Sequence, residues 1–253
     1  MQLSFKTFLI VCPMLFLAGL VDSIGGGGGL ISLPAYLFAG LPVHNAIATN
    51  KMSSTCGTAL SAGRFIRNNL VSFKLAVPAV VSAIIGSSLG AHLSLLVSDR
   101  IMRYVLVIVL PAAAFFVLNR HLFPDREEQE LVLSGRTYVT AVTAAFFIGI
   151  YDGFYGPGTG TFLIIALTVF AHMSVGCANA QTKIINLTTN VTSLLIFLKN
   201  GQVLLLLGFV AALFNMLGNY IGSGLVMTKG TKIVRPIILT VLVLLLLKIV
   251  LDR

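Results

Sequence analysis

The chain has 253 residues, of which 57% are hydrophobic and 10% are charged, and its mean hydropathy is +0.98. This composition excludes an ordinary soluble domain and predicts an all-α, polytopic membrane protein. The net charge of +9 does not indicate nucleic-acid binding, because the basic residues lie singly or in small groups between apolar stretches, where they set membrane topology.

The apolar stretches are predicted to be helices, because lipid leaves the backbone no other open structure. In chain order they are 5–24, 28–40, 44–67, 74–97 and 101–119, followed by 137–154, 159–172, 176–199, 203–228 and 233–251. A helix rises about 1.5 Å per residue and the hydrocarbon core is about 30 Å thick. The second segment of each half is too short to cross, and we expect a half-helix or a re-entrant segment there.

The two halves of the chain resemble each other at an offset of 130 residues, which becomes 132 after a short slip. The matched positions include Gly19 with Gly149, Asp22 with Asp152, Gly26 with Gly156, Gly28 with Gly158, Lys51 with Lys183, and Asn68 with Asn200. We therefore predict a first repeat at 1–120, a polar connecting loop at 121–136 and a second repeat at 137–253. Five segments per repeat would give the two repeats opposite orientations.

Each repeat has a glycine-rich break after its first segment, DSIGGGGGLI at 22–31 and DGFYGPGTGT at 152–161. Such a break exposes backbone polar groups, which lipid tolerates only where protein, water or a ligand completes them. Matching breaks indicate the binding site of a transporter, and helix N-termini favour anions. We expect Gly26, Gly28, Gly156 and Gly158 to present backbone groups to an anion. The alternative is that these glycines only allow helices to cross closely.

The third segment of each repeat carries polar residues, ATNKMSSTCGT at 48–58 and AQTKIINLTTNVTS at 180–193. Lys51 and Lys183 lie inside these segments, where a charge is costly and should face a cavity or a partner. Neutral hydrogen-bonding groups accompany them at Asn50, Ser54 and Thr55 in the first repeat and at Gln181, Asn186 and Asn190 in the second. Together these residues predict a cationic pocket for a small anion.

Two aspartates, Asp22 and Asp152, precede the breaks. They either cap the half-helices or pair with the two lysines, or they take part in proton coupling, and the sequence leaves both roles open. Tyr151 and Tyr155 are expected to shape the cavity in one half only, because Val21 and Gly25 stand opposite them in the repeat.

Glycines spaced four residues apart, Gly86 with Gly90 and Gly218 with Gly222, favour close approach of helices. The four histidines lie far apart, without an HExxH or Cys–His spacing, and no GxxxxGK[ST] motif occurs. We therefore expect no enzyme activity, no metal and no cofactor.

Four stretches carry a resemblance to a known family: FLAGLVDSIGGGGGLISLPAYLFAGLPVHNAIATNK at 16–51, IGIYDGFYGPGTGTF at 148–162, QTKIINLTTN at 181–190 and KGTKIVRP at 229–236. They resemble the TauE/SafE family of sulfite exporters, also called the 4-toluene sulfonate uptake permease family. The resemblance covers nearly the whole chain and is closest to the uncharacterised inner-membrane branch of gamma-proteobacteria. It implies a multi-pass transporter of the bacterial inner membrane that moves sulfur-containing anions such as sulfite or sulfoacetate.

The sequence thus predicts a secondary transporter that moves a small anion, a sulfur oxyanion or an organosulfonate, by rocking one repeat against the other. One alternative is an anion channel or a membrane receptor that binds without transport. Another is a transporter of a cation liganded by the two aspartates, which the paired lysines would repel. The expected partners are the anion and the lipid bilayer, not nucleic acid, and association into a homo-oligomer is left open.

Overall fold

The computed structural model describes residues 4–102, 104, 105, 108 and 133–229 of the chain. Within these residues the regular secondary structure is entirely helical. The helices are α1 (Phe5–Gly25), α2 (Gly29–Phe38), α3 (Val43–Arg67), α4 (Phe73–Leu96), α6 (Gly135–Phe154), α7 (Thr159–Val169), α8 (Val175–Lys199) and α9 (Leu205–Lys229). They confirm eight of the predicted segments to within a few residues. Most of the predicted helix at 101–119, all of the one at 233–251 and most of the loop at 121–136 lie outside the described residues.

Among the described residues, four helices are long and apolar enough to cross a membrane: Phe5–Gly25, Phe73–Leu96, Gly135–Phe154 and Leu205–Thr228. The helices α2 and α7 have only 10 and 11 residues. At about 1.5 Å per residue, each covers about half of a hydrocarbon core of about 30 Å. The short second segments of the two halves are therefore present as expected.

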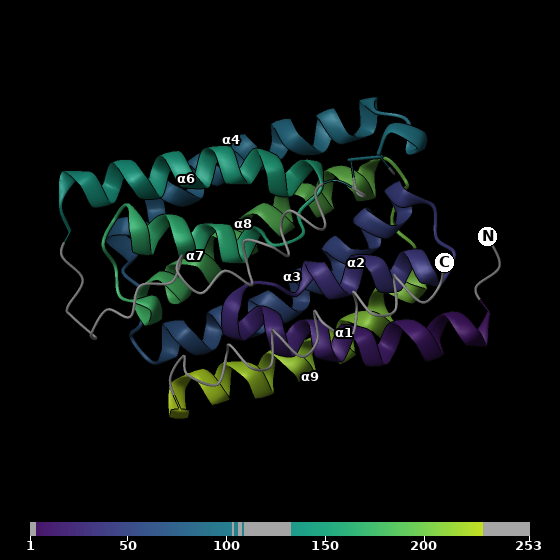
Figure 1. The fold of residues 1–253 in the computed structure, drawn as a ribbon, viewed down its shortest axis with the longest axis horizontal. Helices are drawn as coiled ribbons and strands as arrows, with labels where there is room; N and C mark the ends of the chain where they lie inside the picture. The colour runs from purple at the N-terminus through teal and green to yellow at the C-terminus, as the bar shows by residue number, and fades with distance from the viewer. Residues whose placement is uncertain (1–3, 103, 106–107, 109–132, 230–253) are drawn as a thin grey trace.

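The described helices form two bundles of four (Figure 1). The first bundle contains α1, α2, α3 and α9, and the second contains α4, α6, α7 and α8. The most extensive contacts join α4 to α6 and α1 to α9, so each bundle takes three helices from one half of the chain and one from the other. The bundles meet chiefly where α3 packs against α8. The bundles therefore do not coincide with the predicted repeats at 1–120 and 137–253.

The tight pairs cross at the predicted glycines. A Cβ atom on Gly86 would lie 2.2 Å from the carbonyl oxygen of Phe146, and one on Gly218 would lie 2.0 Å from the carbonyl oxygen of Phe16. A Cβ on Gly90 would lie 2.0 Å from the carbonyl oxygen of Ile150. The backbones are thus in direct contact, as small-residue spacing favours in membrane helices.

Two connections carry the chain from one bundle to the other, 68–72 before α4 and 200–204 before α9. Gln181 of α8 donates a hydrogen bond to the carbonyl oxygen of Ser72 (3.1 Å), and the amide of Leu204 donates to the hydroxyl of Thr49 in α3 (3.1 Å). Each connection is therefore hydrogen-bonded to the bundle that contains the helix following it.

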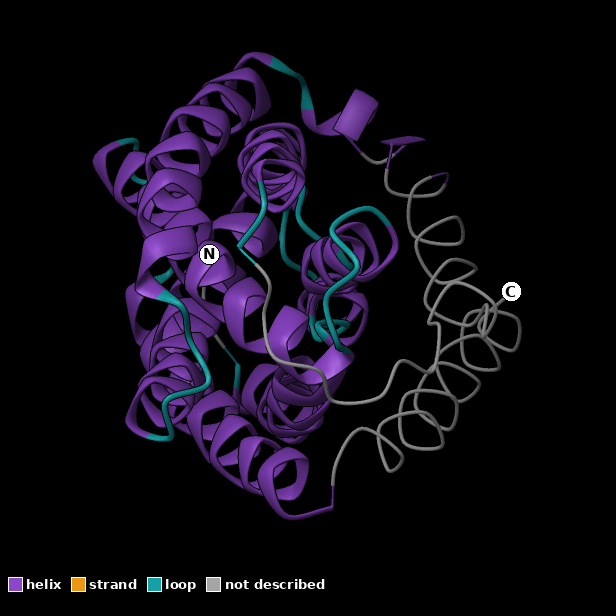
Figure 2. Cartoon of the chain, turned by 90° about the vertical axis from the view of Figure 1, so that its left-hand side faces the viewer, coloured by secondary structure: helices purple, strands orange, loops and turns teal. Residues whose placement is uncertain are grey.

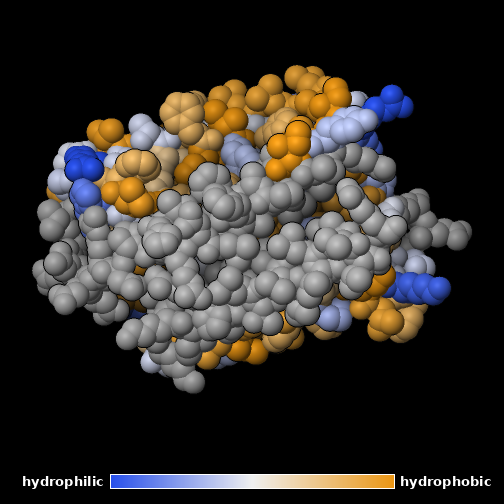
Figure 3. Space-filling model, viewed as in Figure 1, coloured by the Kyte–Doolittle hydropathy of each residue, from blue (hydrophilic) through white to orange (hydrophobic). Residues whose placement is uncertain are grey.

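Many polar side chains are buried in the central helices, and many large apolar side chains lie on the outer surface. Figure 3 shows hydrophobic side chains along the upper and lower edges of the view. Large exposed apolar residues include Val77, Val81, Ile84 and Leu89 on α4 and Leu205, Phe209, Leu213 and Leu217 on α9. The buried polar residues of the central helices include Thr49, Lys51, Ser53, Thr58 and Ser61 on α3 and Gln181, Lys183, Asn186, Asn190 and Ser193 on α8. This arrangement suits a lipid solvent around a polar interior.

Candidate functional site

The helices are interrupted at both predicted breaks. The helix α1 ends at Gly25, and Gly26 has a φ of 77° and donates its amide hydrogen to the carbonyl oxygen of Asp22 (2.8 Å). The helix α6 ends at Phe154, and Gly156 and Gly158 have φ values of 99° and 82°. Side chains with a Cβ rarely adopt these left-handed conformations, so glycine is required at the turning points.

The two breaks touch each other between the bundles. A Cβ on Gly26 would lie 2.3 Å from the carbonyl carbon of Gly160, and a Cβ on Gly29 would lie 2.9 Å from the Cα of Pro157. The two segments therefore pass backbone against backbone. Figure 2 shows the described chain as helices joined by loops. The loss of either glycine would push the breaks apart.

Side chains from the second bundle donate hydrogen bonds to the carbonyl groups that the first break exposes. Thr161 of α7 donates its hydroxyl hydrogen to the carbonyl oxygen of Gly25 (2.8 Å). Asn179 of α8 donates to the carbonyl oxygens of Ser23 (3.2 Å) and Ile24 (3.3 Å). The first break thus satisfies the requirement that exposed backbone in a membrane be completed by other groups.

The two buried lysines form ion pairs with the two aspartates, and each pair joins the two bundles. Lys51 of α3 is 2% exposed, and its Nζ lies 2.8 Å from Oδ2 of Asp152 at the end of α6. Lys183 of α8 is fully buried, and its Nζ lies 2.9 Å from Oδ2 of Asp22 near the end of α1. Every pair therefore links a lysine of one half of the chain to the aspartate of the other half.

Further polar groups surround the Lys51–Asp152 pair. Lys51 donates a hydrogen bond to Oδ1 of Asn190 (3.1 Å), and Thr159 donates its hydroxyl hydrogen to Oδ1 of Asp152 (2.8 Å). A Cβ on Gly156 would lie 3.1 Å from the Nζ of Lys51. The pair therefore lies directly against the second break.

The Lys183–Asp22 pair has fewer partners. Besides the carboxylate of Asp22, Lys183 donates to the main-chain carbonyl oxygen of the same residue. A Cβ on Gly28 would lie 2.6 Å from the Cβ of Asp22, so this glycine allows α1 and the start of α2 to pack tightly beside the pair. Among the described residues, both hydrogen bonds of the Lys183 ammonium group therefore go to Asp22.

The neutral residues predicted for the site lie in different places. Asn186 accepts a hydrogen bond from Asn190 (3.4 Å), which connects it to Lys51. Asn50 is partly exposed and accepts a weak bond from Ser54 (3.5 Å). Gln181 fastens the connection before α4 and makes no bond to either lysine. Asn190, predicted from the sequence to accompany the lysines, bonds to Lys51. Thr159 and Asn179 were not predicted as site residues.

Tyr151 and Tyr155 flank the second break. Tyr151 donates its hydroxyl hydrogen to the carbonyl oxygen of Pro157 (2.6 Å), and its ring lies 6.4 Å from that of Tyr155 and 5.6 Å from that of Phe162. Tyr155 is 2% exposed, and its hydroxyl group has no hydrogen-bond partner among the described residues. These contacts hold the aromatic residues beside the ion pair of Asp152.

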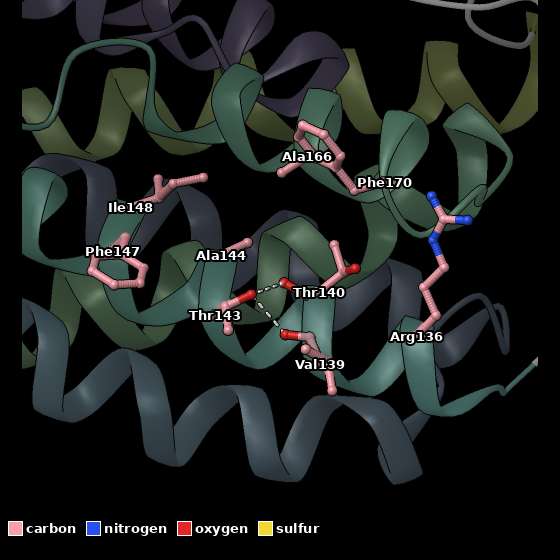
Figure 4. Close-up of a pocket in the computed structure, with 9 residues that line it drawn as sticks. All are labelled: Arg136, Val139, Thr140, Thr143, Ala144, Phe147, Ile148, Ala166 and Phe170. Carbon is pink, nitrogen blue, oxygen red and sulfur yellow. Dashed lines mark hydrogen bonds between the residues drawn. The ribbon is translucent and has the colours of Figure 1, made fainter.

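A separate cavity of about 440 Å³ lies on the outside of the second bundle (Figure 4). It is lined by Arg136, Val139, Thr140, Thr143, Ala144, Phe147 and Ile148, and by Ala166 and Phe170 from the α7 region. Thr143 donates to carbonyl oxygens of its own helix, at Val139 (2.7 Å) and Thr140 (3.2 Å). The lining is mostly apolar and includes none of the predicted site residues.

The described residues contain no group of three or more His, Cys, Asp and Glu side chains that could hold a metal ion. The charged groups between the bundles are two ammonium groups and two carboxylates, so this site carries no net formal charge. Such a site can bind an anion only when a lysine exchanges its aspartate for the ligand or when an aspartate is neutralised.

Comparison with known proteins places these features in a family. Residues 11–249 match the model of the family described as Sulfite exporter TauE/SafE. The chain is 34% identical over 259 residues to "Probable membrane transporter protein YfcA" of Escherichia coli (strain K12), which covers 98% of this chain and 94% of the relative. It is 32% identical to "Probable membrane transporter protein ORF9" of Sinorhizobium sp, over 99% of this chain and 95% of the relative. It is 31% identical to "Probable membrane transporter protein" of Haemophilus influenzae, over 100% of this chain and 98% of the relative. No solved structure matches the chain.

Proposed function

We propose, on the premise that this chain belongs to the Sulfite exporter TauE/SafE family, that it is a secondary transporter of a small sulfur oxyanion or organosulfonate. The family model matches nearly the whole chain, and the relatives that share its length are named membrane transporters. The chain is accordingly a multi-pass bacterial membrane transporter. The substrate, the site and the mechanism are our proposal.

One observation carries the proposal: the two helix breaks and the two buried lysines lie together between the bundles. The breaks touch at Gly26 and Gly160, and the Lys51–Asp152 pair lies against Gly156. A buried ammonium group needs a negatively charged or strongly polar partner. A sulfonate or sulfite offers several oxygen atoms, which suit an ammonium group together with nearby amide donors such as those of Asn186 and Asn190.

Alternating access would proceed by movement of one bundle against the other. The sequence suggested that the repeats are the moving bodies, but the closest contacts, α4 with α6 and α1 with α9, hold helices of opposite halves together. The interface between the bundles is smaller than the contacts of α4 with α6 and of α1 with α9, and it contains both ion pairs. A movement of one bundle against the other at this interface would therefore open the site, and an anion would take the place of a carboxylate at one of the lysines.

The cation alternative is disfavoured by the same geometry. Both aspartates already lie within 3 Å of an ammonium group, at 2.9 Å for Asp22 and 2.8 Å for Asp152. A cation at either carboxylate would be repelled by the adjacent lysine, because like charges at this distance interact strongly away from water.

A thermal-shift screen of the purified protein would test the substrate class. The ligands are sulfite, thiosulfate, taurine, sulfoacetate, sulfate and a set of carboxylates. A ligand that binds the folded state at about 100 times its Kd stabilises it by about 2.7 kcal/mol. We expect stabilisation by sulfonates or sulfite and not by carboxylates of the same charge. Equal stabilisation by all anions, or by none, would contradict the proposed substrate class.

A further inference from the structure

We infer that the two ion pairs have different functions: the Lys183–Asp22 pair opens when Asp22 takes up a proton and Lys183 binds the anion, whereas the Lys51–Asp152 pair stays closed and holds the bundles in register. This inference rests on the proposed function and assigns its coupling ion and its anion-binding lysine. The two pairs are equivalent in the sequence repeat, so the assignment depends on how their surroundings differ.

The first difference is access to water. The side chain of Asp22 is 14% exposed, whereas that of Asp152 is 3% exposed. The lysines of both pairs are almost completely buried, at 0% for Lys183 and 3% for Lys51. A proton or an anion therefore reaches the first pair through the aspartate, and the second pair offers no comparable opening.

The second difference is the number of other side chains that are hydrogen-bonded to each ion pair. Asp152 accepts a hydrogen bond from Thr159, and Lys51 donates one to Asn190. The position that corresponds to Thr159 in the first repeat is Gly29, which has no side chain to offer Asp22. Separation of Lys51 from Asp152 would disturb a network of four side chains, whereas separation of Lys183 from Asp22 disturbs two.

The third difference concerns what can neutralise Asp22. Of the helices that pack against α1, α2 carries the ionisable residue Tyr36, α7 carries none, and α3 carries His44, Lys51, Cys56, Arg64 and Arg67. The helix α8 carries Cys177, Lys183 and Lys199, α9 carries Tyr220 and Lys229, and α1 itself carries Lys6 and Cys12. Among the described side chains of this set, only Lys183 forms an ion pair with Asp22.

The strongest alternative cations are engaged elsewhere. Lys51 pairs with Asp152, and Arg64 lies 4.3 Å above the ring of Tyr220 and donates to the carbonyl oxygen of that residue. When Lys183 turns to an anion, Asp22 is therefore left without a cation in a largely buried position. A proton on Asp22 would then restore the charge balance of the buried site.

The step conserves charge. A proton from water adds to a carboxylate oxygen of Asp22 and forms a neutral carboxylic acid. Lys183 keeps its proton and its positive charge, gives up the carboxylate and accepts a monovalent anion in its place. The pair is neutral before the exchange and neutral after it, so one proton accompanies each monovalent anion and the buried site gains no net charge.

Uptake of methanesulfonate into proteoliposomes tests the assignment. This sulfonate carries one negative charge throughout the working pH range, so any pH response belongs to the protein. For the wild type, an inward proton gradient of about one pH unit should raise the final accumulation of methanesulfonate by about tenfold, since one proton enters with each anion. In Asp22→Asn the amide imitates the protonated acid, and the ratio of accumulation with and without the gradient should fall to about 1.

The matched variant is Asp152→Asn. Its absolute uptake and its thermal unfolding temperature should both fall, because the network with Lys51, Asn190 and Thr159 is weakened, but its response to the gradient should persist. Thr159→Val, which removes only one hydroxyl group from that network, should show the same pattern in milder form. The inference is overturned if Asp152→Asn loses the gradient response while Asp22→Asn keeps it, or if both lose it equally.

A binding measurement that does not depend on uptake separates this inference from the proposed function. Infrared difference spectra of the purified protein, recorded with and without methanesulfonate at constant pH, report carboxyl groups that take up a proton when the anion binds. A carboxylic acid band should appear in the wild type and in Asp152→Asn and be absent in Asp22→Asn. Thermal stabilisation of the wild type by methanesulfonate without this band, or a band that survives in Asp22→Asn, would refute the assignment. No stabilisation and no band in any of the three proteins would refute the substrate class and the inference with it.

Discussion

Lys183 shows how burial and charge are balanced at a single residue. Its side chain is inaccessible to solvent, and within the described part of the chain its ammonium group bonds to the carboxylate and the main-chain carbonyl of Asp22. Breaking a buried pair by removing one partner typically costs about 3–5 kcal/mol, because a charge is left uncompensated. Because apolar residues of the same size would pack as well without the cost of burying a charge, Lys183 is better explained by a function than by stability.

Replacement of Lys183 should strongly reduce transport at low substrate concentration and should also lower stability, because Asp22 loses its partner. In Lys183→Met the side chain keeps its length and loses its charge, so the anion loses a charge-assisted hydrogen bond of about 1.5–3 kcal/mol, or about 10- to 100-fold in affinity. Initial uptake by proteoliposomes measures the effect at low substrate concentration. The control is Lys199→Met, an exposed lysine at the end of the same helix, which should behave as the wild type. Equal uptake by the two variants would place the anion site elsewhere.

At the scale of the elements, the half-helices α2 and α7 are positioned by their glycine breaks. The close approach of Gly26 to Gly160 brings the ends of α1 and α6, and hence both aspartates, toward the lysines of the opposite bundle. A turn alone would not require this contact, because Gly40 and Gly201 also have a positive φ, and a Cβ on either would meet nothing within 4 Å. Glycine is therefore required at position 26 for two reasons: the left-handed backbone conformation and the close contact with Gly160.

Substitution of two glycines separates these two requirements. Gly26 and Gly40 both have a positive φ, 77° and 85°, but a Cβ on Gly40 would meet nothing within 4 Å. Gly40→Ala should cost only the strain of a left-handed alanine, about 1–2 kcal/mol. Gly26→Ala adds an overlap with the backbone of Gly160, so we expect a clearly larger fall in thermal unfolding temperature and loss of uptake. Similar losses in both variants would show that backbone conformation alone matters.

At the scale of the whole molecule, the two halves of the chain are interlocked. The helix α4 leaves the first half to pack against α6 and α8, and α9 leaves the second half to pack against α1 and α3. The matched fastening of the two connections, by Gln181 and by Thr49, repeats this exchange at positions 132 residues apart. The halves are thus related in sequence but depend on each other in space.

Separate expression of the halves tests this dependence. Fragments 1–120 and 121–253 should each aggregate or be degraded in the membrane, because α4 or α9 would lack its main packing partner. Co-expression should restore a complex that co-purifies in detergent and unfolds as a unit. A fragment that is monodisperse and helical by itself would contradict the exchange of helices between bundles.

Much of the fold could be predicted from the sequence because hydropathy and glycine content report local structure. The eight described helices, the two breaks and the burial of Lys51 and Lys183 all follow from such signals. The pairing of Lys51 with Asp152 and not with Asp22 could not be predicted, because it depends on which bundle each helix joins. The contacts of Thr159 and Asn190 could not be predicted for the same reason, since a hydroxyl or amide on a polar helix face does not reveal which neighbour it meets.

The fastening of the two connections limits where the molecule can flex. Gln181 holds Ser72, Asn45 holds Gln202 and Thr49 holds Leu204, so the stretches that precede these bonds are only 68–71 and 200–201. Both contain a residue with positive φ at the matched position, Asn69 at 55° and Gly201 at 66°. These two short hinges lie remote in sequence from the ion pairs, so stiffening them would slow the conformational cycle without altering the affinity for the transported ion.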